Sequence, residues 1–208
     1  GSTPTTLLLS SVLESVNVPI VAAGGFRDGS GLAASLAWGA CGIAMGTRFM
    51  MTKESPVPHD TKEAYLSANV EDIKITKKFD GMSHRLIFNN YIKKIDRSNP
   101  ISLFIISIIS AWKYKQLTNA SYADLIKSFI AMLKGDDLTI SQSIMSANSP
   151  AIIQKAMVEG SPNEGAMPSG QVAGLISNLP SCKQLVDQIM DEFSFAAENF
   201  NKLEGDKQ

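Results

Sequence analysis

The sequence has little of what marks several large classes of protein. Its only cysteines, Cys41 and Cys182, form neither a metal-binding spacing nor a disulfide framework, which fits a reducing compartment. The most apolar run, residues 101–112, contains serines and is too short to span a bilayer. Lys and Arg number 19 against 20 Asp and Glu, so the charge predicts neither a nucleic-acid nor a membrane partner. No signal peptide is apparent, and we expect a cytoplasmic protein.

Histidine is also scarce, which limits the possible acid–base and metal chemistry. The two histidines, His59 and His84, stand in no recognisable catalytic or metal-ligand spacing, so we predict surface or structural roles and no metal site. The remaining composition, with 44% hydrophobic and 19% charged residues, is that of an ordinary globular protein.

The most informative stretch is predicted to be a strand, a helix and a second strand. Residues 18–23 form an apolar run that ends at Gly24-Gly25, as in a strand buried on both faces. A helix is predicted over residues 30–38, with Asp28 or Ser30 as its cap and Gly39 as its stop. Residues 43–45 form a second strand that ends at Gly46-Thr47. This spacing indicates a right-handed parallel crossover, which brings both glycine turns to one edge of the sheet.

Ligands of parallel α/β sheets and barrels collect at the carboxyl ends of the strands. Glycines allow backbone N–H groups to approach an anion closely, and the N-terminus of the following helix adds positive potential. One glycine pair would most simply permit a tight turn, but its repetition on consecutive strands favours phosphate binding. The predicted phosphate site consists of Ala23, Gly24, Gly25, Met45, Gly46 and Thr47.

Residues 19–49, PIVAAGGFRDGSGLAASLAWGACGIAMGTRF, resemble the FMN-phosphate segment of the nitronate monooxygenase family, which includes flavin-dependent enoyl-ACP reductases. Shorter matches lie at residues 5–9, 79–82 and 168–176, whereas residues 100–150 contain no motif that we can place. The resemblance implies an FMN-binding TIM barrel whose last two strands end in these glycine turns. FMN is therefore the expected cofactor.

The resemblance further implies oxidation of small alkyl nitronates with dioxygen. The family's catalytic histidine lies upstream of this chain, so we assign no catalytic residue. An FMN-dependent enoyl-ACP reductase on the same fold is an alternative, and so is a non-catalytic half-barrel that binds phosphate or a partner chain. An inosine-monophosphate-dehydrogenase-like barrel is disfavoured because no cysteine nucleophile loop is visible.

Three further residues are weighed as ligand contacts. Ser169 and Gln171 flank a glycine in a loop, where flavin or substrate contact and an ordinary turn are equally good interpretations. Arg48 follows the second glycine turn, and we favour a structural ion pair with Glu54 over a phosphate contact.

A complete eight-stranded barrel usually needs about 250 residues, and only two convincing parallel strands are present here. We therefore predict the C-terminal part of an α/β TIM barrel with an added, mostly helical segment. Residues 1–70 would hold the last barrel strands and the FMN-phosphate site, residues 71–160 the helical subdomain, and residues 161–208 a return loop and a C-terminal helix. We expect association with a missing N-terminal half or with another copy, and no turnover by the isolated chain.

The remaining elements are predicted from apolar periodicity and from breaks at Gly and Pro. Residues 71–79 and 85–91 are expected to form an antiparallel hairpin. Pro150 is expected to precede a helix at 151–158, and residues 161–170 are expected to be loop. The other predicted helices are residues 5–16, 62–69, 101–111, 122–133 and 181–203.

Overall fold

The computed structural model describes residues 3–118 and 140–205. Internal contacts divide the chain into two compact units. The first unit consists of residues 1–56 and 170–208, and the second consists of residues 57–169. The three-part division of the sequence, with boundaries near residues 70 and 160, stays a prediction.

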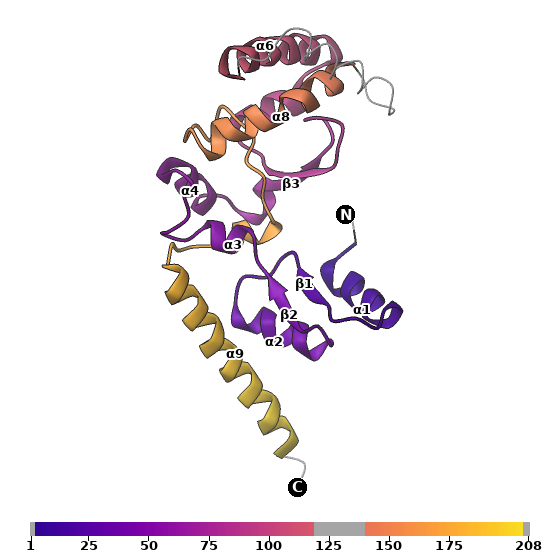
Figure 1. Cartoon of the computed structure of the whole chain (residues 1–208), viewed down its shortest axis with the longest axis vertical. Helices are drawn as coiled ribbons and strands as arrows, with labels where there is room; N and C mark the ends of the chain where they lie inside the picture. The colour runs from indigo at the N-terminus through magenta and orange to yellow at the C-terminus, as the bar shows by residue number, and fades with distance from the viewer. Residues whose placement is uncertain (1–2, 119–139, 206–208) are drawn as a thin grey trace. The chain divides into compact units, whose positions relative to one another are not determined.

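The first unit contains the predicted strand–helix–strand segment (Figure 1). Strands β1 and β2 are parallel, and Ala22 pairs with Ile43 in their register. Asp28 caps the intervening helix α2 by accepting a hydrogen bond from the N–H of Gly31 at 2.9 Å. The elements of this unit are α1 (Thr5–Ser15), β1 (Val21–Ala23), α2 (Gly29–Ala37), β2 (Gly42–Ala44), α3 (Thr47–Met50), the 3₁₀ helix η2 (Gln171–Leu175) and α9 (Cys182–Gly205).

Helix α1 is held against the strands by a small apolar cluster and one polar bond. Leu9 of α1 is buried with Ala22 of β1 and Phe26 of the following connection. The Thr5 hydroxyl donates a hydrogen bond of 3.0 Å to the carbonyl of Gly24. The start of α1 therefore lies beside the carboxyl end of β1.

Helix α9 packs closely on α2, and the contact depends on a glycine. Gly29, the first residue of α2, is buried, and a Cβ built on it would lie 2.2 Å from the carbonyl oxygen of Ile189. Leu185 and Ile189 turn the apolar face of α9 inward and are buried. This close approach fixes α9 along the helix that connects the two parallel strands.

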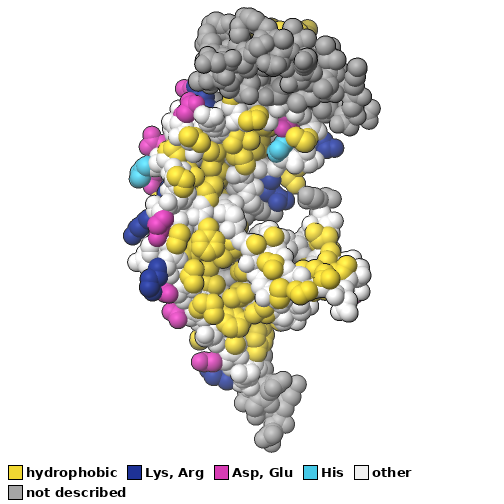
Figure 2. Space-filling view, in the orientation of Figure 1, with side chains coloured by type: hydrophobic (Ala, Val, Ile, Leu, Met, Phe, Trp, Pro, Cys, Tyr) yellow, Lys and Arg dark blue, Asp and Glu magenta, His cyan; other side chains and the backbone are white. Residues whose placement is uncertain are grey.

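In the part of the chain that the structure describes, β1 is not buried on both faces, so this prediction from the sequence is wrong there. Only Ala22 of this strand is buried, whereas Val21 is 56% exposed. Within the described residues the sheet has only β1 and β2, so no further strand flanks them. Figure 2 shows apolar side chains gathered on the surface of this unit.

The second unit combines helices with the predicted antiparallel hairpin. Strands β3 and β4 pair with Ile75 opposite Arg85. Phe79, Leu86 and Ile92 belong to its apolar core. The elements are α4 (His59–Leu66), the 3₁₀ helix η1 (Val70–Asp72), β3 (Ile73–Thr76), β4 (His84–Ile87), α5 (Asn90–Arg97), α6 (Pro100–Thr118) and α8 (Ile140–Met157).

Some elements of the second unit differ from the sequence prediction. The second hairpin strand ends at Ile87 because the Asn89 side chain accepts a hydrogen bond from the N–H of Ile92 and so caps α5. The prediction that Pro150 precedes a helix is wrong, because Pro150 lies inside α8. The helix predicted over residues 122–133 lies outside the described residues.

Polar side chains tie the predicted loop of residues 161–170 to the second unit. The Tyr65 hydroxyl donates to the carbonyl of Pro168 at 2.5 Å, and the Asn89 amide donates to the carbonyl of Gly165 at 2.8 Å. Burial raises the pKa of Tyr65, so its hydroxyl keeps the proton that it donates. Apart from an isolated bridge between Leu86 and Pro168, residues 161–169 form no helix or strand. None of the described helices is both long enough and apolar enough to cross a membrane.

Candidate functional site

The two glycine turns lie at the same edge of the parallel sheet, as predicted. β1 and β2 run in the same direction with Ala23 opposite Ala44. Gly24-Gly25 directly follow β1, and Met45 and Gly46 directly follow β2. The carboxyl ends of both strands therefore present their turns together, which is the edge where α/β proteins bind ligands.

The first turn has a backbone conformation that suits glycine alone. Gly24 and Gly25 have φ values of 99° and 86°, in the region that side chains with a Cβ rarely adopt. A Cβ built on Gly25 would meet no atom within 4 Å, and the same holds for Gly46 in the second turn. Both turns therefore border open space rather than packed protein.

Thr47 has a structural partner that the sequence did not indicate. Its hydroxyl accepts a hydrogen bond of 2.9 Å from the N–H of Gly170. A Cβ on Gly170 would lie 3.1 Å from that oxygen, so the two backbones approach closely. The start of η2, with exposed Gln171, is thereby held beside the second glycine turn.

Ser169 is held differently from the residue that follows it. Its N–H donates to the carbonyl of Arg85 at 3.0 Å, which extends the hairpin of the second unit. A role for Ser169 or Gln171 at a flavin or substrate stays a prediction.

The N-terminus of α2 is already occupied by carboxylates. Asp28 accepts from the N–H of Gly31, and Glu192 of α9 accepts from the N–H of Gly29 at 2.8 Å. The expectation that this helix end adds its positive potential to an anion site is therefore wrong. An anion at this edge depends on the amides of the glycine turns.

Arg48 is a structural residue, but its predicted partner is wrong. It is buried, and its guanidinium donates to the carbonyl and side-chain oxygens of Asn178 at 3.2 and 2.7 Å. Burial and the like charge of Arg27 lower the pKa of the guanidinium, and Glu192 opposes this shift. Glu54 instead accepts from the N–H of Cys182 at the start of α9.

The histidines have surroundings consistent with surface or structural roles. His59 begins α4 and lies within 3.8 Å of Asp60 and 3.7 Å of Glu63 on the surface. The Nε2 atom of His84 lies 2.8 Å from a carboxylate oxygen of Asp80, which is fully buried. Among the described residues, no three His, Cys, Asp or Glu side chains are grouped as a metal site.

Sequence reasoning missed several residues that shape this edge. Thr5, Asn178 and Glu192 contact the turns or the elements beside them from distant parts of the chain. Each is an ordinary polar residue in a helix or loop, with no motif to distinguish it. Only the tertiary structure brings these residues together.

Comparison with known proteins identifies the family. A family model described as nitronate monooxygenase matches residues 1–192. The chain therefore belongs to the nitronate monooxygenase family, whose members are oxidoreductases.

The individual relatives carry different names. The chain is 44% identical over 190 residues to a (3aS,4S,5R,7aS)-5-hydroxy-7a-methyl-1-oxo-octahydro-1H-indene-4-carboxyl-CoA dehydrogenase of Rhodococcus jostii (strain RHA1), covering 91% of this chain and 54% of that protein. It is 40% identical over 86 residues to a probable nitronate monooxygenase of Staphylococcus haemolyticus (strain JCSC1435), covering 41% of this chain and 24% of that protein.

Among solved structures, FabK (M276A mutant) from Thermotoga maritima is similar, with a TM-score of 0.66 and 28% identity. The alignment covers 98% of this chain and 50% of FabK. The chain thus spans about half the length of the relatives that it matches over most of its own length.

Proposed function

We propose that this chain forms the C-terminal part of an FMN-dependent oxidoreductase built on a TIM barrel. The observation that carries the proposal is the pair of glycine turns at the same edge of two parallel strands. A phosphate site after the last two strands, beside a short extra helix, recurs in TIM-barrel enzymes. The short helix α3 directly follows Gly46 here.

The residues of this edge fit a phosphate group. The amides of Gly24, Gly25, Gly46 and Thr47 would hold it, since the space beside Gly25 and Gly46 is open and a side chain there would fill it. Ala23 and Met45 would border the group at the strand ends. The Thr47 hydroxyl would keep its bond from Gly170, so Gln171 would be held near the same edge. When bound, FMN would accept electrons from one substrate and deliver them to another.

For the substrate, we favour a thioester of coenzyme A. The support is the similarity to the Rhodococcus jostii dehydrogenase, which extends over 91% of this chain. Oxidation of a small nitronate with dioxygen is the second candidate, supported by the family description and by the probable nitronate monooxygenase. Reduction of an enoyl-ACP on the same fold is a third, supported by the likeness to FabK.

The uncovered faces of β1 and β2 support a further part of the proposal. Val21 is 56% exposed, and Ile43 is only partly buried. We propose that further strands of the same polypeptide or a second copy cover these residues. The catalytic base would then come from those strands, and neither His59 nor His84 is assigned this role.

The test uses the purified full-length protein. Flavin released by heating should elute as FMN. Under anaerobic conditions the flavin bound to the protein should bleach only when the enzyme's true substrate is added. Bleaching by an acyl-CoA thioester supports the favoured substrate, and bleaching by an alkyl nitronate supports the second. A colourless protein that takes up no added FMN would refute the flavoenzyme proposal.

A further inference from the structure

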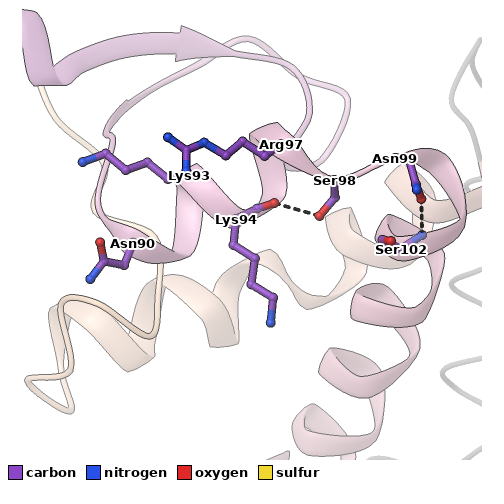
Figure 3. A pocket seen from close by; sticks show the side chains of 7 residues that line it. All are labelled: Asn90, Lys93, Lys94, Arg97, Ser98, Asn99 and Ser102. Atoms are coloured by element: carbon purple, nitrogen blue, oxygen red, sulfur yellow. Dashed lines mark hydrogen bonds between the residues drawn. The ribbon is translucent and has the colours of Figure 1, made fainter.

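The second unit contains a polar cavity that the flavin site does not include. Its volume is about 540 Å³, and it lies along α5 and the start of α6 (Figure 3). The seven lining residues are Asn90, Lys93, Lys94, Arg97, Ser98, Asn99 and Ser102. Among the described residues, the lining therefore combines three cations with neutral hydrogen-bonding side chains and includes no carboxylate.

The cations lie on a helix that is firmly placed. Ile92 and Ile95 are each 1% exposed and fix the inner face of α5 in the apolar core. Asn89 caps the start of the helix. The charged side chains of α5 therefore extend from a rigid support, which reduces the entropy that a ligand must overcome on binding.

The spacing of the charges is unfavourable without an anion. Lys93 and Arg97 are four residues apart on α5 and project to the same side in Figure 3, and like charges at this spacing destabilise a helix. Among the described residues, no carboxylate forms an ion pair with Lys93, Lys94 or Arg97. Asp96 of the same helix pairs with Lys78 instead. Cations in the last turn of a helix are favoured by the helix dipole. The dipole does not explain why Lys93 is placed four residues before Arg97.

The connection to α6 fixes the other side of the cavity. The Ser98 hydroxyl donates to the carbonyl of Lys94 at 2.7 Å, and the Asn99 side chain accepts from the N–H of Ser102 at 2.8 Å (Figure 3). These bonds set the positions of Ser98 and Asn99 next to the basic residues. The cavity wall is thus defined by both helices.

We propose that this cavity binds the adenosine 3′,5′-bisphosphate end of coenzyme A. The inference rests on the proposed thioester substrate and deepens it by assigning the nucleotide end to particular residues. In this assignment one phosphate group lies between Lys93 and Arg97, which are four residues apart on α5, and Lys94 contacts a second phosphate. The volume falls within the range of about 300–1,000 Å³ of small-molecule sites. The similarity to the Rhodococcus jostii CoA dehydrogenase favours a nucleotide over an acidic carrier protein as the occupant.

The test is a calorimetric titration of the full-length protein with adenosine 3′,5′-bisphosphate at low salt. The triple variant Lys93→Gln/Lys94→Gln/Arg97→Gln should bind at least about tenfold more weakly, because it loses its charge-assisted contacts. The control Lys53→Gln/Lys183→Gln/Lys202→Gln removes three positive charges from exposed positions outside the cavity and should bind as the wild type does. Adenosine 5′-monophosphate, which differs from the bisphosphate only in lacking the 3′-phosphate, should bind about tenfold more weakly.

Several results would overturn the assignment. One is a wild type that does not bind the bisphosphate. The others are equal losses in the two triple variants and equal affinity for adenosine 5′-monophosphate and the bisphosphate. Cavity-dependent binding of an acidic acyl carrier protein without nucleotide binding would overturn it as well. FMN content, measured on the same samples, should be unchanged in the cavity variant. A wild-type protein that contains no FMN would contradict the proposed function, whatever the result of the nucleotide titration.

Discussion

Replacing Gly29 with alanine should push helix α9 away from helix α2. A Cβ at this position would lie 2.2 Å from the carbonyl oxygen of Ile189, 2.5 Å from the nitrogen of Phe193 and 2.6 Å from the Cβ of Glu192. Two of these three atoms belong to the backbone of α9 and cannot turn away. The clash is relieved only if α9 moves from α2.

The cost follows from two contributions. Forcing an extra methyl group into a packed contact destabilises a protein by about 1–3 kcal/mol. Moving α9 also weakens the hydrogen bond of 2.8 Å that the N–H of Gly29 donates to the Glu192 carboxylate. A hydrogen bond to a charged group contributes about 1.5–3 kcal/mol. We therefore expect Gly29→Ala to lower the free energy of unfolding by about 3 kcal/mol or more.

Urea unfolding of the full-length protein, followed by circular dichroism, measures this loss. Gly42→Ala is the matched control, because its Cβ would meet no atom within 4 Å. We expect the control to differ from the wild type by no more than about 1 kcal/mol. Equal stabilities of Gly29→Ala and Gly42→Ala would refute the close approach of α2 and α9.

Three further changes probe other contacts. Arg48→Met keeps an apolar stem but removes both bonds to Asn178, so it should lower the free energy of unfolding by about 1.5–3 kcal/mol in the same urea assay. The N–H of Cys182 lowers the pKa of Glu54, so the carboxylate stabilises the fold above its ordinary pKa of about 4.3 and loses this effect as the pH falls through the lowered value. Glu54→Gln should therefore show a smaller loss of stability on acidification than the wild type, and identical pH profiles would contradict this assignment. Tyr65→Phe leaves the carbonyl that its hydroxyl contacts without that donor and should cost about 1–2 kcal/mol, whereas an unchanged urea midpoint would show that the bond contributes nothing.

The strand–helix–strand segment could be predicted because its signals are local. A short apolar run, a capping Asp28 and a stop at Gly39 determine the elements without distant contacts. Gly39 indeed adopts a φ of 107°. The direction of the two strands then followed from the length of the connection between them.

Other features depend on contacts that a sequence pattern does not carry. Helix α3 is only four residues long, too short to show any periodicity, so the sequence predicts only a turn there. Pro150 lies inside α8, although the local preference of proline is for the start of a helix. Arg48 has a carboxylate nearby in the sequence, yet it bonds to Asn178 at a separation of 130 residues.

If the two glycine turns hold the phosphate of FMN, a change in either turn should weaken FMN binding to the full-length apoprotein. Gly46 has an ordinary φ of −82° and open space beside it, so Gly46→Val should fold normally while its side chain fills the phosphate position. Gly42→Val is the control, since it adds the same side chain at the other end of β2. We expect Gly46→Val to raise the dissociation constant of FMN by at least about tenfold, equivalent to one lost charge-assisted contact, with no such change in Gly42→Val. Equal FMN affinity in Gly46→Val and the wild type would show that this turn does not hold the phosphate.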